Sequence, residues 1–254
     1  MRIVLRCDPE LAPYLPRPQA AHAVLPEWLR RMPPDAFSPT HGSAVRTVKK
    51  CPPFVDAMTH GFVMTLPCDV RVDDGVFSWD WDVPAPAAWM HPRSPLSFHV
   101  PEQVSGSPLF RPDQVVVKFN SFWTIELEAG WSLYATHPAN RMDLPFRTLS
   151  GLVDADRYHD VGILFPALWV EPGFNGMLKR ATPVAQCFPV RREALELSFE
   201  TLDPQKVEAY DRLGRQLLSQ NGVYRKRYRA PRSRGMTEAL AQSLEIEPEP
   251  PAGG

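Results

Sequence analysis

Residues 128–190 read Glu128-Ala129-Gly130-Trp131 at their start, Gly151-Leu152-Val153-Asp154 in the middle and Thr182-Pro183-Val184-Ala185-Gln186 near their end. Short apolar runs lie between these patterns, and Pro or Gly turns separate the runs. Short runs bounded by turn residues are typical of strands in an all-β domain. The stretch therefore predicts a mainly β fold.

The composition agrees with this fold class and narrows the function classes. Of 254 residues, 29 are proline and 14 are glycine, and proline disfavours helix interiors because it lacks an amide donor and clashes with the preceding turn. Lys and Arg total 28 against 29 Asp and Glu, which gives no overall attraction to nucleic acid or to a membrane surface. No apolar run reaches the ~18 residues that suggest a membrane-spanning helix, so we expect no membrane partner.

The cysteines and the N-terminus indicate a compartment. Cys7, Cys51, Cys68 and Cys187 form no C-x-x-C pair, and Met1–Asp8 lacks the apolar stretch of a signal peptide. These features predict a cytoplasmic protein with reduced, mostly buried thiols. A zinc site built from Cys51, Cys68 and histidines is an alternative that the spacing does not support.

A proline-rich segment covers residues 9–40 and contains Trp28. We interpret it as an extended strap whose Trp28 docks on the core of the sheet. A partner-binding proline segment is the alternative, but the segment has no clean P-x-x-P repeat.

A hairpin is predicted where Asp73-Asp74-Gly75 separates two alternating runs, 70–72 and 76–82, because Asp-Gly between such runs favours a tight β-turn. Three aromatic residues of the second run share one face: Phe77, Trp79 and Trp81. Such a row indicates a core or an interface with a partner chain, with stacking against a base or sugar as the alternative.

One helix is predicted near the C-terminus, over residues 203–221. Asp203-Pro204 begins it, since Asp caps a helix and Pro fits the first helical position, and Gly222 ends it. Its apolar positions follow a helical period. With this helix, residues 1–222 are predicted to form a single β-rich domain.

Residues 223–254 divide into a basic arm and an acidic tail. The basic arm, 223–235, contains Arg and Lys without an acid, whereas the acidic tail, 236–254, contains Glu without a base. We expect the tail to end in disorder. Tyr224 and Tyr228 alternate with basic residues. The basic arm is therefore either a solvated segment or a segment that contacts phosphate or nucleic acid.

Three patterns of the middle stretch keep a fixed order: Gly130-Trp131-Ser132-Leu133-Tyr134, then Gly151-Leu152-Val153-Asp154-Ala155-Asp156-Arg157-Tyr158, then Ala181-Thr182-Pro183-Val184-Ala185-Gln186. In this order they resemble the hairpin, the Gly-x-(Ile/Val)-Asp-x-Asp-Tyr motif and the Gly-Asp-x-Ile-Ala-Gln motif of the dUTPase and dCTP-deaminase superfamily. The resemblance implies a β-clip or jelly-roll-like core, a homo-oligomer and a nucleotide ligand.

The same resemblance locates candidate site residues. Asp154 corresponds to the carboxylate that orients the attacking water, although an Asp after Gly-Leu-Val is also a good turn former. Thr136-His137-Pro138-Ala139-Asn140-Arg141 replaces the phosphate-binding Arg-Ser-Ser. The paired serines are absent, but three of these side chains could still hold an anion. The ligand-binding candidates are therefore His137, Asn140, Arg141, Asp154 and Tyr158, and Asp154 is the candidate catalytic residue.

The whole chain also resembles a family of phage and bacterial proteins with no established activity, which share Lys-Lys-Cys-Pro, here Lys49–Pro52, and the two later motifs. Nucleotide hydrolysis needs a base, a nucleobase pocket and a magnesium-bound triphosphate clamp, and only a candidate base is visible. The leading hypothesis is a non-catalytic ligand-binding or assembly protein. The alternative is a divergent nucleotide pyrophosphatase.

A non-haem metal oxygenase is a further, less favoured alternative. Its facial iron site needs two histidines and a carboxylate, commonly with a His-x-Asp or His-x-Glu pair, and the chain contains neither pair. No metal site is predicted, and the cofactor stays unknown.

Overall fold

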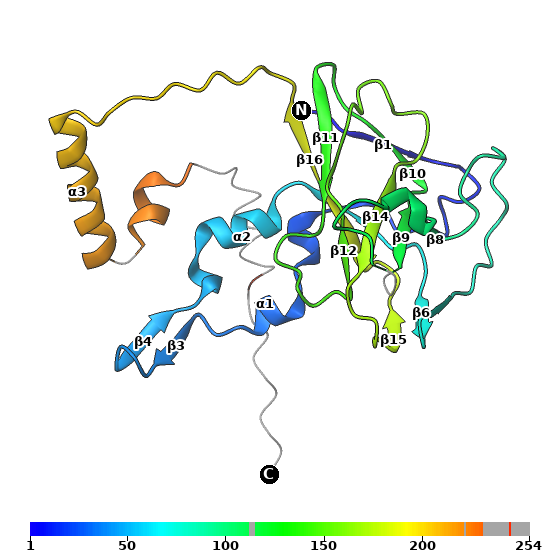
Figure 1. The fold of residues 1–254 in the computed structure, drawn as a ribbon, viewed down its shortest axis with the longest axis horizontal. Helices are drawn as coiled ribbons and strands as arrows, with labels where there is room; N and C mark the ends of the chain where they lie inside the picture. Colours follow the sequence, from blue (N-terminus) through cyan, green and yellow to red (C-terminus); the bar gives the residue numbers. More distant parts are fainter. Residues whose placement is uncertain (112–114, 221, 231–243, 245–254) are drawn as a thin grey trace, which may run out of the picture.

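The computed structural model describes residues 1–111, 115–220, 222–230 and 244. Most of the regular structure consists of short strands, and the helices are few (Figure 1). The prediction of an all-β fold is confirmed.

Two larger sheets form the body of the chain. The five-stranded sheet contains, in spatial order, β13 (Gly151–Val153), β11 (Trp131–Thr136), β16 (Pro183–Arg191), β5 (Phe62–Thr65) and β2 (Gln19–Ala20). The four-stranded sheet contains β12 (Phe146–Thr148), β14 (Leu164–Trp169), β9 (Val116–Asn120) and β8 (Leu96–Phe98). All of these pairs are antiparallel.

The two sheets share one apolar core. Alternate residues of their strands point inward, as the two-residue period of a strand requires, and they form one buried cluster. Its members from the two sheets include Phe62, Met64, Val117, Phe119, Leu133, Phe146, Phe165 and Cys187. The predicted aromatic row belongs mainly to this core: Phe77 and Trp79 pack against it, and Trp81 packs against the neighbouring Phe122.

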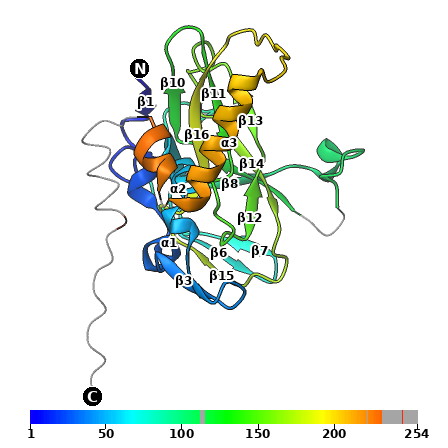
Figure 2. The same ribbon diagram turned by 90° about the vertical axis from the view of Figure 1, so that its left-hand side faces the viewer.

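Three small sheets surround this core: β1 (Val4–Cys7) with β10 (Trp123–Glu126), β15 (Gly176–Leu178) with β6 (Val70–Asp73) and β7 (Val76–Ser78), and β3 (Asp35–Ser38) with β4 (Ser43–Arg46). The predicted hairpin is confirmed, with Asp74 and Gly75 at φ 47° and 77°. The connection around 84–111 is a surface loop that contains β8 and the short helix η3 (Pro101–Val104), and it projects to one side in Figure 2.

The strap prediction is partly wrong. Trp28 lies in a helix, α1 (Glu27–Arg31), which follows η1 (Ala21–Val24), and not in an extended segment. It packs beside a small cluster of Leu25, Leu29 and Met58 instead of the sheet core. The cause is the second apolar surface offered by α2 (Pro52–Thr59), which is preceded by η2 (Val48–Lys50).

The predicted helix is present as α3 (Pro204–Ser219), and the Asp203 side chain caps it by accepting a hydrogen bond from the Lys206 N–H at 2.8 Å. Gly222 follows at φ 77°. None of the residues of α3 is buried. An extended segment of the chain joins the end of β16 to α3 and holds the helix away from the sheets (Figure 1).

The basic arm contains one helical turn, η4 (Tyr224–Tyr228). The predicted acidic tail and the end of the basic arm, residues 231–243 and 245–254, lie outside the described residues. Among the described helices, none is long and apolar enough to cross a membrane.

All four cysteines are free thiols, but the expectation that most are buried is wrong: Cys187 is buried, Cys7 and Cys68 are half-buried, and Cys51 is exposed. Burial raises the pKa of Cys187 and, together with nearby Asp69, raises that of Cys68 to about 11.

Candidate functional site

The five predicted site residues fall into two groups at opposite ends of β11. Asp154 follows β13, whose Val153 pairs with Leu133 near the start of β11. His137 follows the other end of β11. Because a strand rises about 3.4 Å per residue, the two groups are separated by about 17 Å along the strand. Arg141 lines a small pocket with Ala139 and Gln186, and neither Asp154 nor Tyr158 is among the residues of that pocket.

Asp154 is held by neighbours from two strands. Its Oδ1 accepts a hydrogen bond from the Ser132 hydroxyl at 2.6 Å and another from Arg192 Nη1 at 3.2 Å. Its carbonyl oxygen accepts from the N–H groups of Arg157 and Tyr158 at 2.9 and 2.8 Å. This is the geometry of a turn former anchored to β11, and the side chain of Tyr158 remains 54% exposed.

Asp156 strengthens the same anchor. Arg192 Nη1 donates to one of its carboxylate oxygens at 2.8 Å, Arg192 Nη2 contacts the other, and the Gly130 N–H donates to it at 2.9 Å. The Arg192 hydrogen bond, followed by that of Gly130, holds the pKa of Asp156 well below its usual range. Two carboxylates and one guanidinium thus fix the point at which the chain leaves β16.

We expect the Asp156→Asn variant to be less sensitive to acid than the wild type. The pKa of Asp156 is lower in the folded chain than in the unfolded chain, where it is about 3.9. Its ionised form therefore stabilises the fold above about pH 4, and this contribution is lost as pH falls through the folded pKa. Denaturant unfolding at about pH 7 and about pH 3 should show a smaller loss of stability for the variant.

The matched control for this change is Asp82→Asn. Asp82 is exposed and forms no ion pair with the described residues. Its replacement should leave the loss of stability at low pH as large as in the wild type. Equal behaviour of the two variants would contradict a specific role of the Asp156–Arg192 pair.

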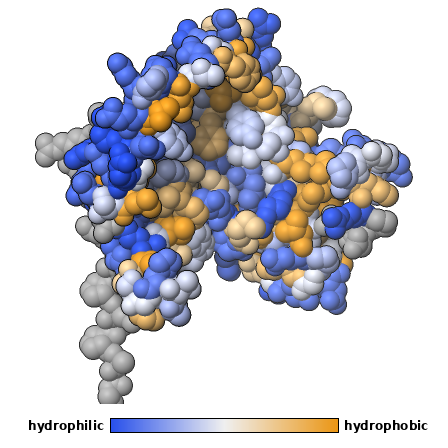
Figure 3. All heavy atoms as spheres, turned by 60° about the vertical axis from the view of Figure 1, so that its left-hand side comes forward, coloured by the Kyte–Doolittle hydropathy of each residue, from blue (hydrophilic) through white to orange (hydrophobic). Residues whose placement is uncertain are grey.

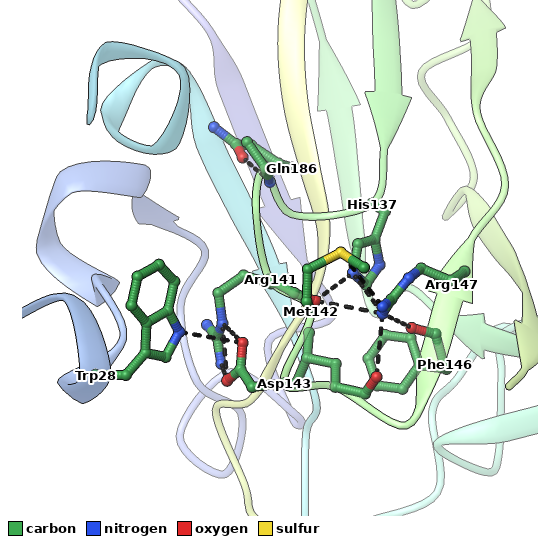
Figure 4. A network of polar contacts seen from close by, with 10 residues as sticks. Trp28, His137, Arg141, Met142, Asp143, Phe146, Arg147 and Gln186 are labelled. Carbon is green, nitrogen blue, oxygen red and sulfur yellow. Dashed lines mark hydrogen bonds and ion pairs between the residues drawn. The ribbon is translucent and has the colours of Figure 1, made fainter. Parts of the chain in front are cut away.

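His137 is half-buried at the other end of β11, and its two ring nitrogens have different partners (Figure 4). Nδ1 accepts a hydrogen bond from the Thr148 N–H at 3.3 Å, and Nε2 lies 2.8 Å from the carbonyl oxygen of Arg141. An acceptor at Nδ1 and a donor at Nε2 require the neutral Nε2–H tautomer. Burial lowers the pKa of His137, which agrees with a neutral ring that holds a loop.

Arg147 closes this loop, residues 137–147. Its Nη1 lies 3.3, 3.1 and 3.0 Å from the carbonyl oxygens of Arg141, Leu144 and Phe146 (Figure 4). Carbonyl oxygens at a loop turn need donors when they are shielded from water, and one guanidinium supplies them here. The charge of Arg147 is thus used within the chain.

Arg141, the predicted anion ligand, is also paired within the chain. Its Nε and Nη2 each donate to the Asp143 carboxylate at 2.9 Å, and Asp143 accepts a further hydrogen bond from Trp28 Nε1 at 3.3 Å. Asn140 adopts φ 58°, and its side chain contacts the carbonyl oxygen of Phe54 at 3.5 Å. The loop in place of the Arg-Ser-Ser motif therefore connects β11 to α1 and α2.

Gln186 is the last residue of the Thr-Pro-Val-Ala-Gln motif. The structure shows that it joins several elements, a role that its residue type alone did not predict. Its side chain is 1% exposed. Its Oε1 accepts from the Ala139 N–H at 2.8 Å, and its Nε2 donates to the carbonyl oxygens of Ala57 and His60 at 2.9 and 2.7 Å. One amide thus joins β16, the 137–147 loop and the end of α2.

An open groove of about 530 Å³ lies beside β1 and β10 and contains several ionisable side chains, among them Arg6, His91, Glu126 and His159. Arg6 and Glu126 form an ion pair at 2.5 Å. Within the described ranges, however, no three His, Cys, Asp or Glu side chains come together as metal ligands. The described residues do not bring together the two histidines and a carboxylate that the oxygenase alternative requires.

The segment after Arg192, residues 193–203, exposes several apolar side chains. We call it the arm, as distinct from the basic arm at 223–235. Leu195, Leu197 and Phe199 are 90, 78 and 90% exposed, and they alternate with the polar residues Glu196 and Ser198. Figure 3 shows apolar side chains around the hollow at this side of the molecule. The three apolar side chains thus alternate along a segment that pairs with no strand of the described residues.

Comparisons with known proteins show a distant likeness in fold. No family model matches the chain, and no curated protein matches it in sequence. A mutant dUTPase from phage phi11 of S. aureus is 14% identical, with a TM-score of 0.25 over 36% of this chain and 74% of that chain. A mutant dUTPase of Staphylococcus bacteriophage 80alpha with dUpNHpp is 10% identical, with a TM-score of 0.34 over 80% of this chain and 93% of that chain. These values amount to a weak fold-level resemblance to phage dUTPases.

Proposed function

We propose that the chain is a non-catalytic assembly protein that binds a second copy of itself through the arm. The carrying observation is the alternation of three apolar side chains that are at least 78% exposed on an extended segment. A segment with this pattern has one apolar face and a backbone free to pair, which is the form in which strands add to the edge of a sheet.

The five-stranded sheet of the same chain has an unpaired edge to which the arm can add. β13 is a terminal strand of the five-stranded sheet, and its outer edge pairs with no strand of the described chain. Leu152 of β13 is 62% exposed and lies opposite Tyr134 of β11, which is 38% exposed. An unpaired edge beside an apolar face is a template for another strand. One chain carries both the segment that is added, the arm, and the edge that receives it, β13. The favoured partner is therefore a second copy of the chain.

The free energy gained by burying the apolar side chains of the arm is of the same size as the cost of association. Burying three Leu or Phe side chains contributes about 5–9 kcal/mol at about 1.5–3 kcal/mol each. Association costs about 4–15 kcal/mol in lost translational and rotational freedom. The two ranges overlap, and the backbone hydrogen bonds of strand pairing add to the favourable side.

The contacts of the predicted site residues support a non-catalytic protein over the pyrophosphatase alternative. The Asp154 carboxylate is hydrogen bonded to Ser132 and Arg192, and Arg141 is paired with Asp143. A general base must reach the proton that it removes, and a phosphate clamp needs free donors. Asp154 Oδ1 and the Nε and Nη2 groups of Arg141 are thus already engaged within the chain.

We expect the wild-type chain to sediment as a dimer or larger species, with a mass of at least twice 28.7 kDa. The triple variant Leu195→Ser, Leu197→Ser, Phe199→Ser should sediment as a monomer, because it removes the apolar face and leaves the fold of the sheets untouched. Sedimentation velocity over a range of protein concentrations measures this difference.

The matched control changes the other face of the same segment: Glu196→Ser, Ser198→Ala, Glu200→Ser. It should associate like the wild type. A monomeric wild type at every concentration, or equal dissociation of both triple variants, would show that the alternation of the arm does not drive assembly.

A further inference from the structure

We propose that a basic groove between α3, η4 and the β4–η2 segment binds single-stranded nucleic acid. The groove has a volume of about 390 Å³. Its basic lining residues come from two segments that are distant in sequence: Arg46 and Lys50 from the β4–η2 segment, and Arg225 from η4. This surface involves neither the arm nor β13, so the inference goes beyond self-association.

The charge of the groove is available to a ligand. Arg46 and Arg225 form no ion pair with any residue of the described chain, whereas Lys50 is paired with Asp35 at 2.5 Å. The described lining residues include no Asp or Glu. Asp35 lies opposite Arg46 across β3 and β4, where it is paired with Lys50. The two unpaired guanidinium groups attract phosphate, which guanidinium binds through paired hydrogen bonds.

Inside the groove, the Arg46 side chain packs against the backbone at Gly222. Gly222 adopts φ 77°, and a Cβ atom there would lie 3.6 Å from Nη1 of Arg46. The Arg46 guanidinium thus lies against Gly222, which follows α3 and precedes η4. Arg46 and Arg225 therefore line one groove and not two separate faces.

An aromatic side chain in the same groove identifies the class of polyanion. Tyr224 lines the groove and is 42% exposed. Proteins that bind single strands combine a positive groove along the backbone with aromatic rings that stack on the bases. A sulfated polysaccharide would use the arginines but has no base to stack on Tyr224. A duplex keeps its bases inside the helix and offers Tyr224 no base face.

The test measures fluorescence anisotropy of the full-length chain with a labelled single-stranded oligonucleotide of about 12 nucleotides. We expect Tyr224→Leu to weaken binding about tenfold, because stacking on one base contributes about 1–3 kcal/mol. Each of Arg46→Gln and Arg225→Gln should lower the salt dependence, log Kd against log salt, by about 0.7, and the double variant by about 1.4.

The control is Arg71→Gln, which removes the same charge from an exposed position on β6, away from α3 and β4 in Figure 1. It should leave both the affinity and the salt dependence unchanged. Equal losses for Arg71→Gln and the groove variants would overturn the proposal, as would no binding at about 50 mM salt.

Two competitors separate the ligand classes. Unlabelled single strand should displace the probe at far lower concentration than duplex or heparin. Displacement by heparin at equal concentration, together with wild-type affinity of Tyr224→Leu, would assign the groove to another polyanion and overturn the proposal. The sedimentation mass of the groove variants should equal that of the wild type, which keeps this test separate from that of the arm.

Discussion

The Gly61→Ala variant is expected to lose about 2–5 kcal/mol of folding free energy. Gly61 lies between α2 and β5 at φ 73°, a conformation that costs an Ala residue about 1–2 kcal/mol. A Cβ atom at this position would lie 2.2 Å from the carbonyl oxygen of Cys187 on β16. Such a contact forces the backbone of β5 away from β16, which adds about 1–3 kcal/mol. Urea unfolding measures the difference from the wild type.

Gly75→Ala separates the two causes. Gly75 adopts φ 77°, almost the same as Gly61, but a Cβ atom there would meet no atom within 4 Å. This control should cost only the about 1–2 kcal/mol of the left-handed conformation. If both variants lose the same free energy, the close approach of β5 and β16 is not as the structure has it. The comparison matters for function because β16 continues into the arm.

The Gln186→Leu variant is expected to lose a similar amount, about 3–5 kcal/mol. Leucine matches the size of the glutamine side chain but has no polar atoms. The carbonyl oxygens of Ala57 and His60 and the N–H group of Ala139 would each lose their partner, the buried Gln186 amide. A lost hydrogen bond costs about 0.5–1.5 kcal/mol, and up to about 3 kcal/mol where water does not replace the partner. Thermal and urea unfolding should both show the loss.

The control for this change is Gln205→Leu in the first turn of α3, where the glutamine side chain is exposed. It makes the same chemical change without removing a buried hydrogen bond, and its effect should stay within about 0.5 kcal/mol. Wild-type stability of Gln186→Leu would contradict the role of this amide in joining α2, β16 and the 137–147 loop.

Local rules of turns and caps made parts of the fold predictable. The Asp74-Gly75 turn and the Asp203 cap depend on residues adjacent in sequence, and the structure has both. The apolar runs around 115–119 and 122–127 form the strands β9 and β10. They enter different sheets, however, because the Ser121 backbone N–H bonds to the carbonyl oxygen of Ile163, far along the chain.

The candidate site was less predictable for the same physical reason. The role of Asp154 depends on Arg192, which lies 38 residues further along the chain. That of Arg141 depends on whether Asp143 pairs with it. Residue types alone show what a side chain is able to bind, and the fold determines whether a partner within the chain already occupies it. The alternation of Leu195, Leu197 and Phe199 is visible in the sequence, but only the structure shows that nothing in the described chain covers it.

The most direct test of self-association through the arm is a cross-link between copies. A photoreactive residue replaces Leu197 in an equal mixture of isotope-labelled and unlabelled chains, and mass spectrometry identifies the products after illumination. Addition of the arm to the edge of β13 predicts mixed labelled–unlabelled cross-links to residues near Leu152. Cross-links confined to single chains, or mixed products that map away from β13 and β11, would contradict it.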